Sequence, residues 1–219
     1  MQSLEIMTDT WDADRTLNDI RLFLQNHHRI PLEPPHGRDT QPHPSPDQRY
    51  GTIILPLLTL PTGTDRGNLH WPTVQSFLEA LTPLLYTASE ACRISDAERH
   101  DQALRIVGEL LRDQDPRMGV AAITSYSCFE TVRLSVNLAL DAAPLRSDHG
   151  SQVVAVAVIG DFSGGNIVTS SPLRRIEFPV SHGGIFVVGS TPGPILVQNM
   201  VFEGERYQLE FFLPDLSSS

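Results

Sequence analysis

A run of β-branched and small apolar residues, Val153 to Ile159, leads directly into Gly160-Asp161-Phe162-Ser163-Gly164-Gly165. Consecutive β-branched residues favour a buried strand. A cluster of glycine, aspartate and serine favours a tight turn, because glycine accepts backbone angles that other residues avoid. The segment therefore predicts a buried strand that delivers the chain into a hairpin or corner.

Short apolar segments bounded by proline, glycine or serine surround this strand. Those that follow it are 166–169, 174–178, 184–188, 195–201 and 206–213, the last of which alternates polar with apolar residues. Before it, residues 120–126 and 131–140 also fit strands, and 51–60 predicts an edge strand because Pro56 cannot donate to a ladder. Short strands at close, even spacing predict a barrel or jelly roll.

Helices are predicted in the N-terminal half. Residues 13–28 place Leu17, Ile20, Phe23 and Leu24 at helical spacing. A second helix begins near Trp71 and is kinked at Pro83, which removes a backbone donor. Helices followed by a block of strands predict an α+β fold, with a helical layer packed on one face of the β core.

The next helix has a capping-box pattern at its start, Ser95-Asp96-Ala97-Glu98. In such a box the serine and glutamate side chains each satisfy a backbone amide that lacks a helical partner. We therefore expect a helix from Asp96 to about Arg112. Its core-facing residues are predicted to be Leu104, Val107, Leu110 and Leu111.

The length of 219 residues suits one folded domain. Residues 1–50 are predicted to form the N-terminal helix and a Pro-rich flexible segment, and residues 51–219 the β-rich domain with its supporting helices. The beginning of the chain does not resemble a signal peptide, and its apolar runs are too short to span a membrane. Two widely separated cysteines, Cys92 and Cys128, predict reduced, buried thiols. A cytoplasmic location follows, with the nucleus as the alternative.

The charge balance limits the partners of the chain. The net charge is −10, and all 16 basic residues are arginine. An acidic chain without a run of arginines is poorly suited to the phosphate backbone, so we expect no nucleic-acid partner. The absence of lysine excludes Schiff-base chemistry.

The C-terminal part resembles a known family. From about Thr73 onward the chain is similar to the double-stranded β-helix (jelly roll or cupin-like) domain of iron and 2-oxoglutarate-dependent dioxygenases, specifically the fungal relatives of the TET and base-J thymidine hydroxylases. The segments that carry the resemblance are Asp115-Pro116-Arg117-Met118-Gly119-Val120, Tyr126-Ser127-Cys128-Phe129, Asn137, Val153 to Gly165, Gly183-Gly184-Ile185-Phe186 and Gly204 to Phe212. The resemblance implies a β cup with a ligand site inside it.

The metal positions of that family are altered. The family binds iron through a His-x-Asp pair before the long strand and a second histidine before the closing strand. Here the resemblance places Leu145 and Ser147 at the pair and Val197 at the distal histidine. None of these side chains is a competent iron ligand. We therefore expect no metal and no cofactor.

A rearranged metal site is the alternative. A shift of one residue would bring in Asp148 or His149, and His182 lies at the start of a nearby strand. Adjacent strand residues point to opposite faces, which argues against Asp148 and His149 sharing one cavity if the segment is extended. Such a site would imply an active oxygenase.

The position that the resemblance retains is Arg206. In the family, the equivalent arginine holds the distal carboxylate of 2-oxoglutarate, and a planar guanidinium suits that role. Gln208 replaces the serine that usually follows two residues later, and Asn137 matches a polar position of the family. The competing interpretation is that Arg206 pairs with Glu205, Glu210 or another internal acid and only closes the barrel.

These residues favour a degenerate member of the family that has lost iron chemistry. We expect it to bind a small organic ligand, with or without a carboxylate, in a cup lined by Arg206, Asn137, Leu145, Ser147, Val197 and Gln208. Its function would be that of a pseudoenzyme, or of a metal-independent isomerase or cyclase in which positioning provides the catalysis.

Overall fold

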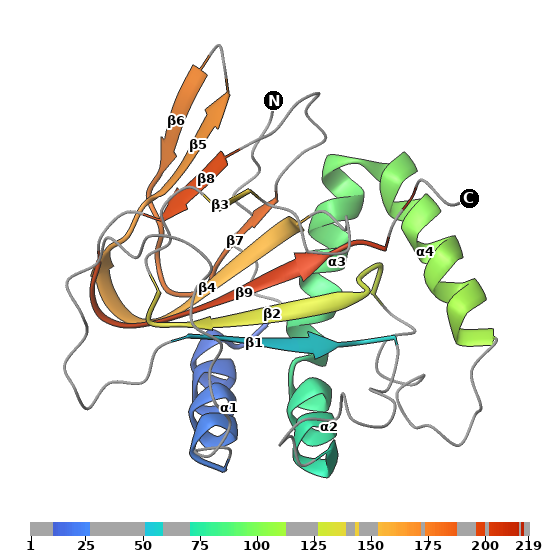
Figure 1. The fold of residues 1–219 in the computed structure, drawn as a ribbon, viewed down its shortest axis with the longest axis horizontal. Helices are drawn as coiled ribbons and strands as arrows, with labels where there is room; N and C mark the ends of the chain where they lie inside the picture. Colours follow the sequence, from blue (N-terminus) through green and yellow to red (C-terminus); the bar gives the residue numbers. More distant parts are fainter. Residues whose placement is uncertain are drawn as a thin grey trace.

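A computed structural model describes residues 11–26, 51–58, 71–112, 127–138, 143–144, 153–171, 174–187, 196–199, 202–214 and 216. In these residues two antiparallel sheets pack with four helices (Figure 1). The predicted Pro-rich segment 29–50 and the predicted strand 120–126 lie outside the described residues.

The strands form a five-stranded sheet of order β1-β2-β9-β4-β7 and a four-stranded sheet of order β3-β8-β5-β6. Their bounds are β1 Gly51–Pro56, β2 Thr131–Val136, β3 Ala143–Pro144, β4 Val153–Gly164, β5 Ile167–Ser171, β6 Arg174–Phe178, β7 Gly184–Val187, β8 Leu196–Asn199 and β9 Phe202–Phe212. The five strands predicted after the apolar run are all present, and β1 is the edge strand that Pro56 predicted.

From β2 to β9 the chain passes back and forth between the two sheets, with β5 and β6 forming a hairpin within the second. Strands β2, β4, β7 and β9 belong to the first sheet, and β3, β5, β6 and β8 belong to the second. Eight antiparallel strands that cross repeatedly between two sheets form a jelly roll. The fold is therefore α+β with a double-stranded β-helix core, as predicted.

The long antiparallel pair of β4 and β9 forms the middle of the first sheet. The glycine segment predicted as a turn continues the strand, since β4 runs to Gly164 and pairs with β9 as far as Phe202. Gly160 and Gly204 have φ values of +141° and +101°, and a Cβ at either position would collide with backbone of the opposite strand. Glycine thus lets both strands bend together without losing their pairing.

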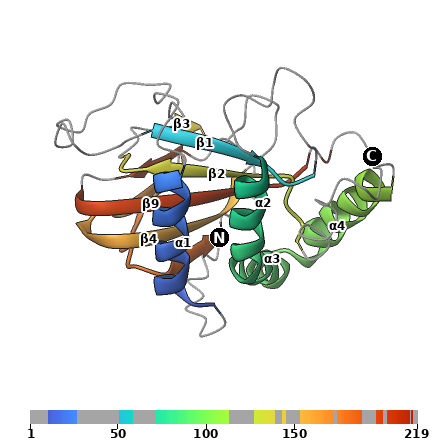
Figure 2. The ribbon, with the colours of Figure 1, turned by 90° about the horizontal axis from the view of Figure 1, so that it is seen from below.

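Helices α1 (Ala13–Asn26), α2 (Trp71–Ala80) and α3 (Thr82–Ser95) lie along one face of the first sheet, and α4 (Ala97–Arg112) lies beyond its end (Figures 1 and 2). The main core lies between these helices and the sheet. It contains the four predicted core residues of α1, namely Leu17, Ile20, Phe23 and Leu24. None of the described helices has the length and apolar content needed to cross a bilayer.

Two details of the helices differ from the sequence prediction. The capping box does not form, because Ser95 ends α3 and the Asp96 carboxylate accepts the Arg99 N–H at 3.1 Å. Asp96 also donates its own N–H to the Cys92 carbonyl at 2.8 Å, so one residue closes α3 and caps α4. On α4 the predicted Val107 is buried, whereas Leu110 is exposed because His100 and Ala103 occupy the inward face.

Candidate functional site

The two faces of the first sheet differ in chemistry, because neighbouring strand residues point to opposite sides. On β9, Tyr207, Leu209 and Phe211 belong to the main core beneath the helices. The residues between them face the second sheet, and we call this side the cup face. The cup face is defined by Arg133, Ser135, Val156, Val158, Arg206, Gln208 and Glu210.

One half of the cup face is apolar. Val156 and Val158 of β4 form a buried cluster with Phe186 of β7, Ile167 of β5 and Phe212 of β9. Because Ile167 belongs to the second sheet, this cluster joins the two sheets. The interior between the sheets is therefore a second, smaller core next to a row of polar side chains.

Arg206 begins the polar half and is only 1% exposed. Its guanidinium carbon lies 5.4 Å from the centre of the Phe162 ring and 5.2 Å from that of Phe202, within the range of cation–π attraction. A Cβ at Gly165 would lie 2.5 Å from Nη1, so glycine provides the space for the guanidinium. Burial lowers the pKa of Arg206 from 12.5 to about 10, which leaves the group charged at neutral pH.

A hydrogen-bonded row continues from Arg206 along β9. The Arg206 Nη2 donates to Gln208 Oε1 at 3.3 Å, and Gln208 Nε2 donates to Glu210 Oε1 at 2.7 Å. Arg133 of β2 then binds the other oxygen of Glu210, with Nε to Oε2 at 2.7 Å. Gln208 thus links the buried guanidinium to the ion pair of the buried Glu210 with Arg133.

The two acids named as possible partners of Arg206 form ion pairs with other arginines. Glu210 forms its ion pair with Arg133, and Glu205 forms one with Arg21 of α1. The Tyr207 hydroxyl also donates to Glu205. Among the described residues, neither acid forms an ion pair with Arg206, so a barrel-closing role through these two residues is wrong.

Asn137 fixes the backbone of Arg206. It has a left-handed conformation with φ of +49°, which is uncommon outside glycine but tolerated by asparagine. Its N–H donates to the Arg206 carbonyl at 2.8 Å, and its Oδ1 accepts the Arg206 N–H at 2.9 Å. The predicted role of Asn137 in ligand contact stays a prediction, and its observed contact positions Arg206.

Of the three predicted metal positions, the structure describes Val197 alone. Val197 of β8 pairs with Ala143 of β3 and with Thr169 of β5. Leu145 and Ser147 lie outside the described residues, as do Asp148 and His149 of the alternative metal site. A leucine, a serine and a valine do not supply the nitrogen and carboxylate ligands that Fe(II) requires, so this set of side chains does not fit the metal.

His182, the remaining member of the alternative metal site, supports the bend of β4. Its Nδ1 accepts the Gly160 N–H at 3.0 Å, and its Nε2 lies 3.5 Å from Asp14 Oδ1 on α1. Within the described part of the chain, no three His, Cys, Asp or Glu side chains gather closely enough to hold a metal ion.

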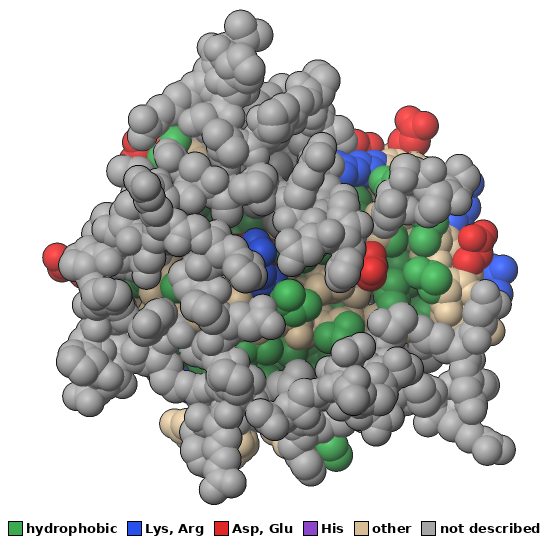
Figure 3. Space-filling view, in the orientation of Figure 1, with side chains coloured by type: hydrophobic (Ala, Val, Ile, Leu, Met, Phe, Trp, Pro, Cys, Tyr) green, Lys and Arg blue, Asp and Glu red, His purple; other side chains and the backbone are tan. Residues whose placement is uncertain are grey.

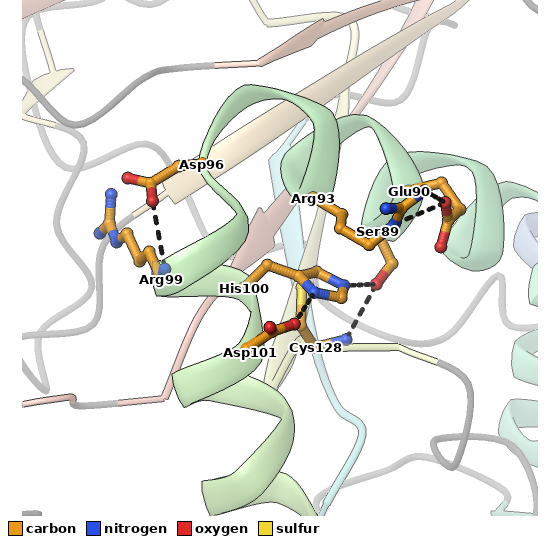
Figure 4. Close-up of polar contacts among 8 residues, drawn as sticks. All are labelled: Ser89, Glu90, Arg93, Asp96, Arg99, His100, Asp101 and Cys128. Atoms are coloured by element: carbon orange, nitrogen blue, oxygen red, sulfur yellow. Dashed lines mark hydrogen bonds and ion pairs between the residues drawn. The ribbon is translucent and has the colours of Figure 1, made fainter.

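A second polar cluster joins α3, α4 and the segment before β2 (Figure 4). His100 Nε2 lies 3.1 Å from Ser89 Oγ, and the same hydroxyl accepts the Cys128 N–H at 3.3 Å. The other ring nitrogen lies 3.3 Å from the exposed Asp101 carboxylate. Ser89 and His100 are buried between the helices, and their contacts stabilise the packing of α4. The spacing of His100 to Ala103 and Val107 could have revealed its inward position.

Both cysteines are free and buried, as the sequence predicted. Their thiols interact with each other, and this contact is the main cause of opposite shifts in the pKa values of the two thiols. The pKa of Cys92 is raised by the contact and by burial. The pKa of Cys128 is lowered by the contact, against the effect of burial, with help from Ser89.

Figure 3 shows the described surface in the view of Figure 1. Apolar side chains gather below the centre and on the right, and charged side chains of both signs lie in small groups towards the right edge. Among the described residues, no broad basic area is visible on this face.

Comparison with known proteins gives weak structural likeness only. No family model matches the chain, and no curated protein matches it in sequence. Similar solved structures include a prolyl-4-hydroxylase from Pseudomonas putida, with 13% identity and a TM-score of 0.44 over 96% of this chain and 91% of that one. Another is a 2OG-Fe(II) oxygenase family oxidoreductase from Burkholderia pseudomallei, with 15% identity and a TM-score of 0.46 over 96% and 82%. The fold assignment rests on the strand order of the protein itself.

Proposed function

We propose that this protein binds a small organic acid between its two sheets, with the Arg206 guanidinium receiving the ligand carboxylate. The observation that carries the proposal is a charged arginine, 1% exposed, held on the cup face between two phenyl rings. Burying a guanidinium is unfavourable, and a planar guanidinium is well suited to bidentate carboxylate binding. A site for an anion gives this arrangement a function.

The apolar half of the cup face indicates the chemistry of the rest of the ligand. Val156, Val158 and Phe186 form an apolar wall beside the row of Arg206, Gln208 and Glu210. A ligand that touches both halves needs an apolar body as well as its carboxylate. We therefore propose a monocarboxylic acid with an aliphatic or aromatic body.

We further propose that the protein is a degenerate relative of the fungal TET and base-J hydroxylases and works without iron. Leucine, serine and valine at positions 145, 147 and 197 support this part of the proposal. The function is then ligand binding by a pseudoenzyme, or isomerisation or cyclisation by positioning alone. Conversion of a bound acid, followed by mass spectrometry, would distinguish the enzyme from the pseudoenzyme.

Ligand binding is tested by ligand-observed NMR with phenylacetate and with its uncharged counterpart, phenylacetamide. We expect the wild-type protein to bind phenylacetate more tightly than the amide. Arg206→Gln should remove this preference, because it removes the charge. The control is Arg93→Gln, which removes an arginine whose side chain is 50% exposed on α3. Equal binding of phenylacetate by wild type and Arg206→Gln would contradict the assignment of Arg206.

The absence of iron chemistry is tested separately. Protein prepared under argon is titrated with Fe(II), or with Mn(II) as an inert substitute, and then supplied with 2-oxoglutarate and oxygen. We expect neither stoichiometric metal binding nor succinate. Metal bound at one ion per chain together with succinate formation would overturn this part of the proposal and favour the rearranged site with His182.

A further inference from the structure

A buried hydroxyl on the cup face has no hydrogen-bond partner in the described structure. Ser135 of β2 is 2% exposed, and its Oγ is shielded from water without a bonded neighbour. Buried side-chain hydroxyls are nearly always hydrogen-bonded, because leaving one unpaired is unfavourable. Ser135 is therefore a candidate for contact with a group that the described residues do not supply.

The described neighbours of Ser135 explain why they leave its hydroxyl without a hydrogen bond. Ser135 pairs directly with Gln208 across the β2–β9 ladder, so the two side chains share the cup face. The Gln208 amide is engaged on both sides, since its oxygen accepts from Arg206 and its nitrogen donates to Glu210. Glu210 in turn is held by Arg133. The polar groups beside the Ser135 hydroxyl are thus already committed to one another.

The position of Ser135 places it close to the proposed carboxylate site. Arg206 lies two residues from Gln208 on the same strand, so it is the diagonal neighbour of Ser135. Diagonal neighbours in an antiparallel pair are about 7 Å apart, within reach of one small ligand. A molecule whose carboxylate contacts Arg206 can therefore present a second polar group to Ser135.

We infer that Ser135 contacts the ligand and that the ligand is a carboxylic acid bearing a hydroxyl group. This inference rests on the proposed binding site at Arg206. A serine hydroxyl has one donor and two acceptor positions, and a ligand hydroxyl can both donate to it and accept from it. The flanking Arg133 and Arg206 have donors only, and the Gln208 and Glu210 oxygens already accept hydrogen bonds, so Ser135 Oγ offers an acceptor to which a ligand hydroxyl can donate. Ser135 thus determines specificity, while Arg206 provides the charge.

The test compares three acids that share a phenyl ring and a carboxylate: phenylacetate, its hydroxy form mandelate and its oxo form benzoylformate. Dissociation constants are measured by NMR titration for wild type and Ser135→Ala. One hydrogen bond corresponds to about a fivefold change in affinity. We expect wild type to prefer mandelate over phenylacetate by about that factor, and Ser135→Ala to lose the preference while binding phenylacetate as before.

The control variant is Ser127→Ala, because Ser127 also has a buried hydroxyl without a partner in the described residues but precedes β2. It should leave the ratio of affinities unchanged. An identical ratio in wild type and Ser135→Ala, or a preference for benzoylformate over mandelate, would overturn the inference while Arg206-dependent binding of phenylacetate stands. If none of the three acids binds, the proposed function itself fails. A melting temperature of Ser135→Ala at or above that of wild type confirms that the variant folds.

Discussion

Replacement of Arg206 by methionine separates a binding role from a structural one. Burial lowers the pKa of Arg206 from 12.5 to about 10, and at 1.36 kcal/mol for each pH unit this corresponds to about 3 kcal/mol against the charged form. Cation–π attraction to the Phe162 and Phe202 rings stabilises the charged form by about 1 kcal/mol for each ring. Methionine keeps apolar contact with both rings and removes the buried charge. Its main disadvantage is the loss of the hydrogen bond to Gln208, worth about 1 kcal/mol.

These contributions nearly cancel, so we expect the free energy of unfolding of Arg206→Met to lie within about 1 kcal/mol of wild type. The assay is urea denaturation followed by circular dichroism, with linear extrapolation to zero denaturant. The matched comparison is Arg133→Met, which leaves the Glu210 carboxylate buried without its arginine. Loss of one partner of such a pair costs about 3 kcal/mol.

Equal stability losses in Arg206→Met and Arg133→Met would refute the reasoning, because Arg206 would then be as necessary to the folded state as the Arg133–Glu210 pair. A small stability change combined with lost acid binding is the outcome expected of a ligand-binding arginine. Proteins keep such unfavourable buried charges where function requires them.

Three further outcomes follow from the contacts described above. Gly165→Ala introduces a Cβ at a φ of +72° and 2.5 Å from Arg206 Nη1, so it should destabilise the protein by about 1–2 kcal/mol in urea and weaken phenylacetate binding in the same NMR titration. Burial raises the pKa of Glu205, but hydrogen bonds from Arg21 and Tyr207 lower it by more, so the pKa in the folded protein lies below 4.5. The ion pair of Glu205 with Arg21 therefore stabilises the fold above pH 4.5, and this stabilisation is lost as the pH falls through the folded-state pKa. Arg21→Gln should therefore cost about 0.5–1 kcal/mol at pH 7, and pH-dependent urea unfolding should show the difference from wild type closing as the pH falls below 4.5. Asp96→Ala removes the cap of α4 and should cost about 1 kcal/mol, whereas unchanged thermal unfolding would contradict its capping role.

The strand pattern of this fold could be predicted because it depends on local chemistry. β-branched runs such as Val153 to Ile159 favour strands wherever they occur, and proline or glycine marks most of the strand ends. The continuation of β4 through Gly160 to Gly164 could not be predicted, because it requires the accompanying bend of β9 at Gly204. A glycine that allows a tight turn also allows a paired bend, and only the partner strand decides between them.

The start of helix α4 is a second case in which a local sequence pattern does not decide the structure. Ser95 and Glu98 match a capping box, but α3 extends through Ser95, so its backbone is already helical and its side chain is not the cap. Asp96 then becomes the residue between two helices and takes the capping role. The sequence pattern was correct about the place where α4 begins, and the length of the preceding helix decided which residue caps it.

The candidate site divides in a similar way. Arg206 could be identified from a resemblance, because it is one residue in a glycine-anchored motif. The partners of Glu205 and Glu210 could not, since Arg21 is 184 positions from Glu205 and Arg133 is 77 positions from Glu210. Such pairings depend on strand register and helix packing, which residue spacing along the chain does not reveal.

Strand register also bears on the ligand selectivity proposed above. On β2 and β9 it places Ser135 opposite Gln208 and Arg133 opposite Glu210, with Arg206 as the next cup-facing residue of β9. The ion pair of Arg133 with Glu210 is internally neutral, so it contributes rigidity to this wall more than attraction for an anion. Under the two proposals, Arg206 recognises the charge of the ligand, Ser135 recognises its hydroxyl, and the valines of β4 contact its apolar body. None of these three proposed contacts requires a side chain at positions 145, 147 or 197, so the proposed selective binding of a hydroxy acid does not depend on metal ligands at those positions.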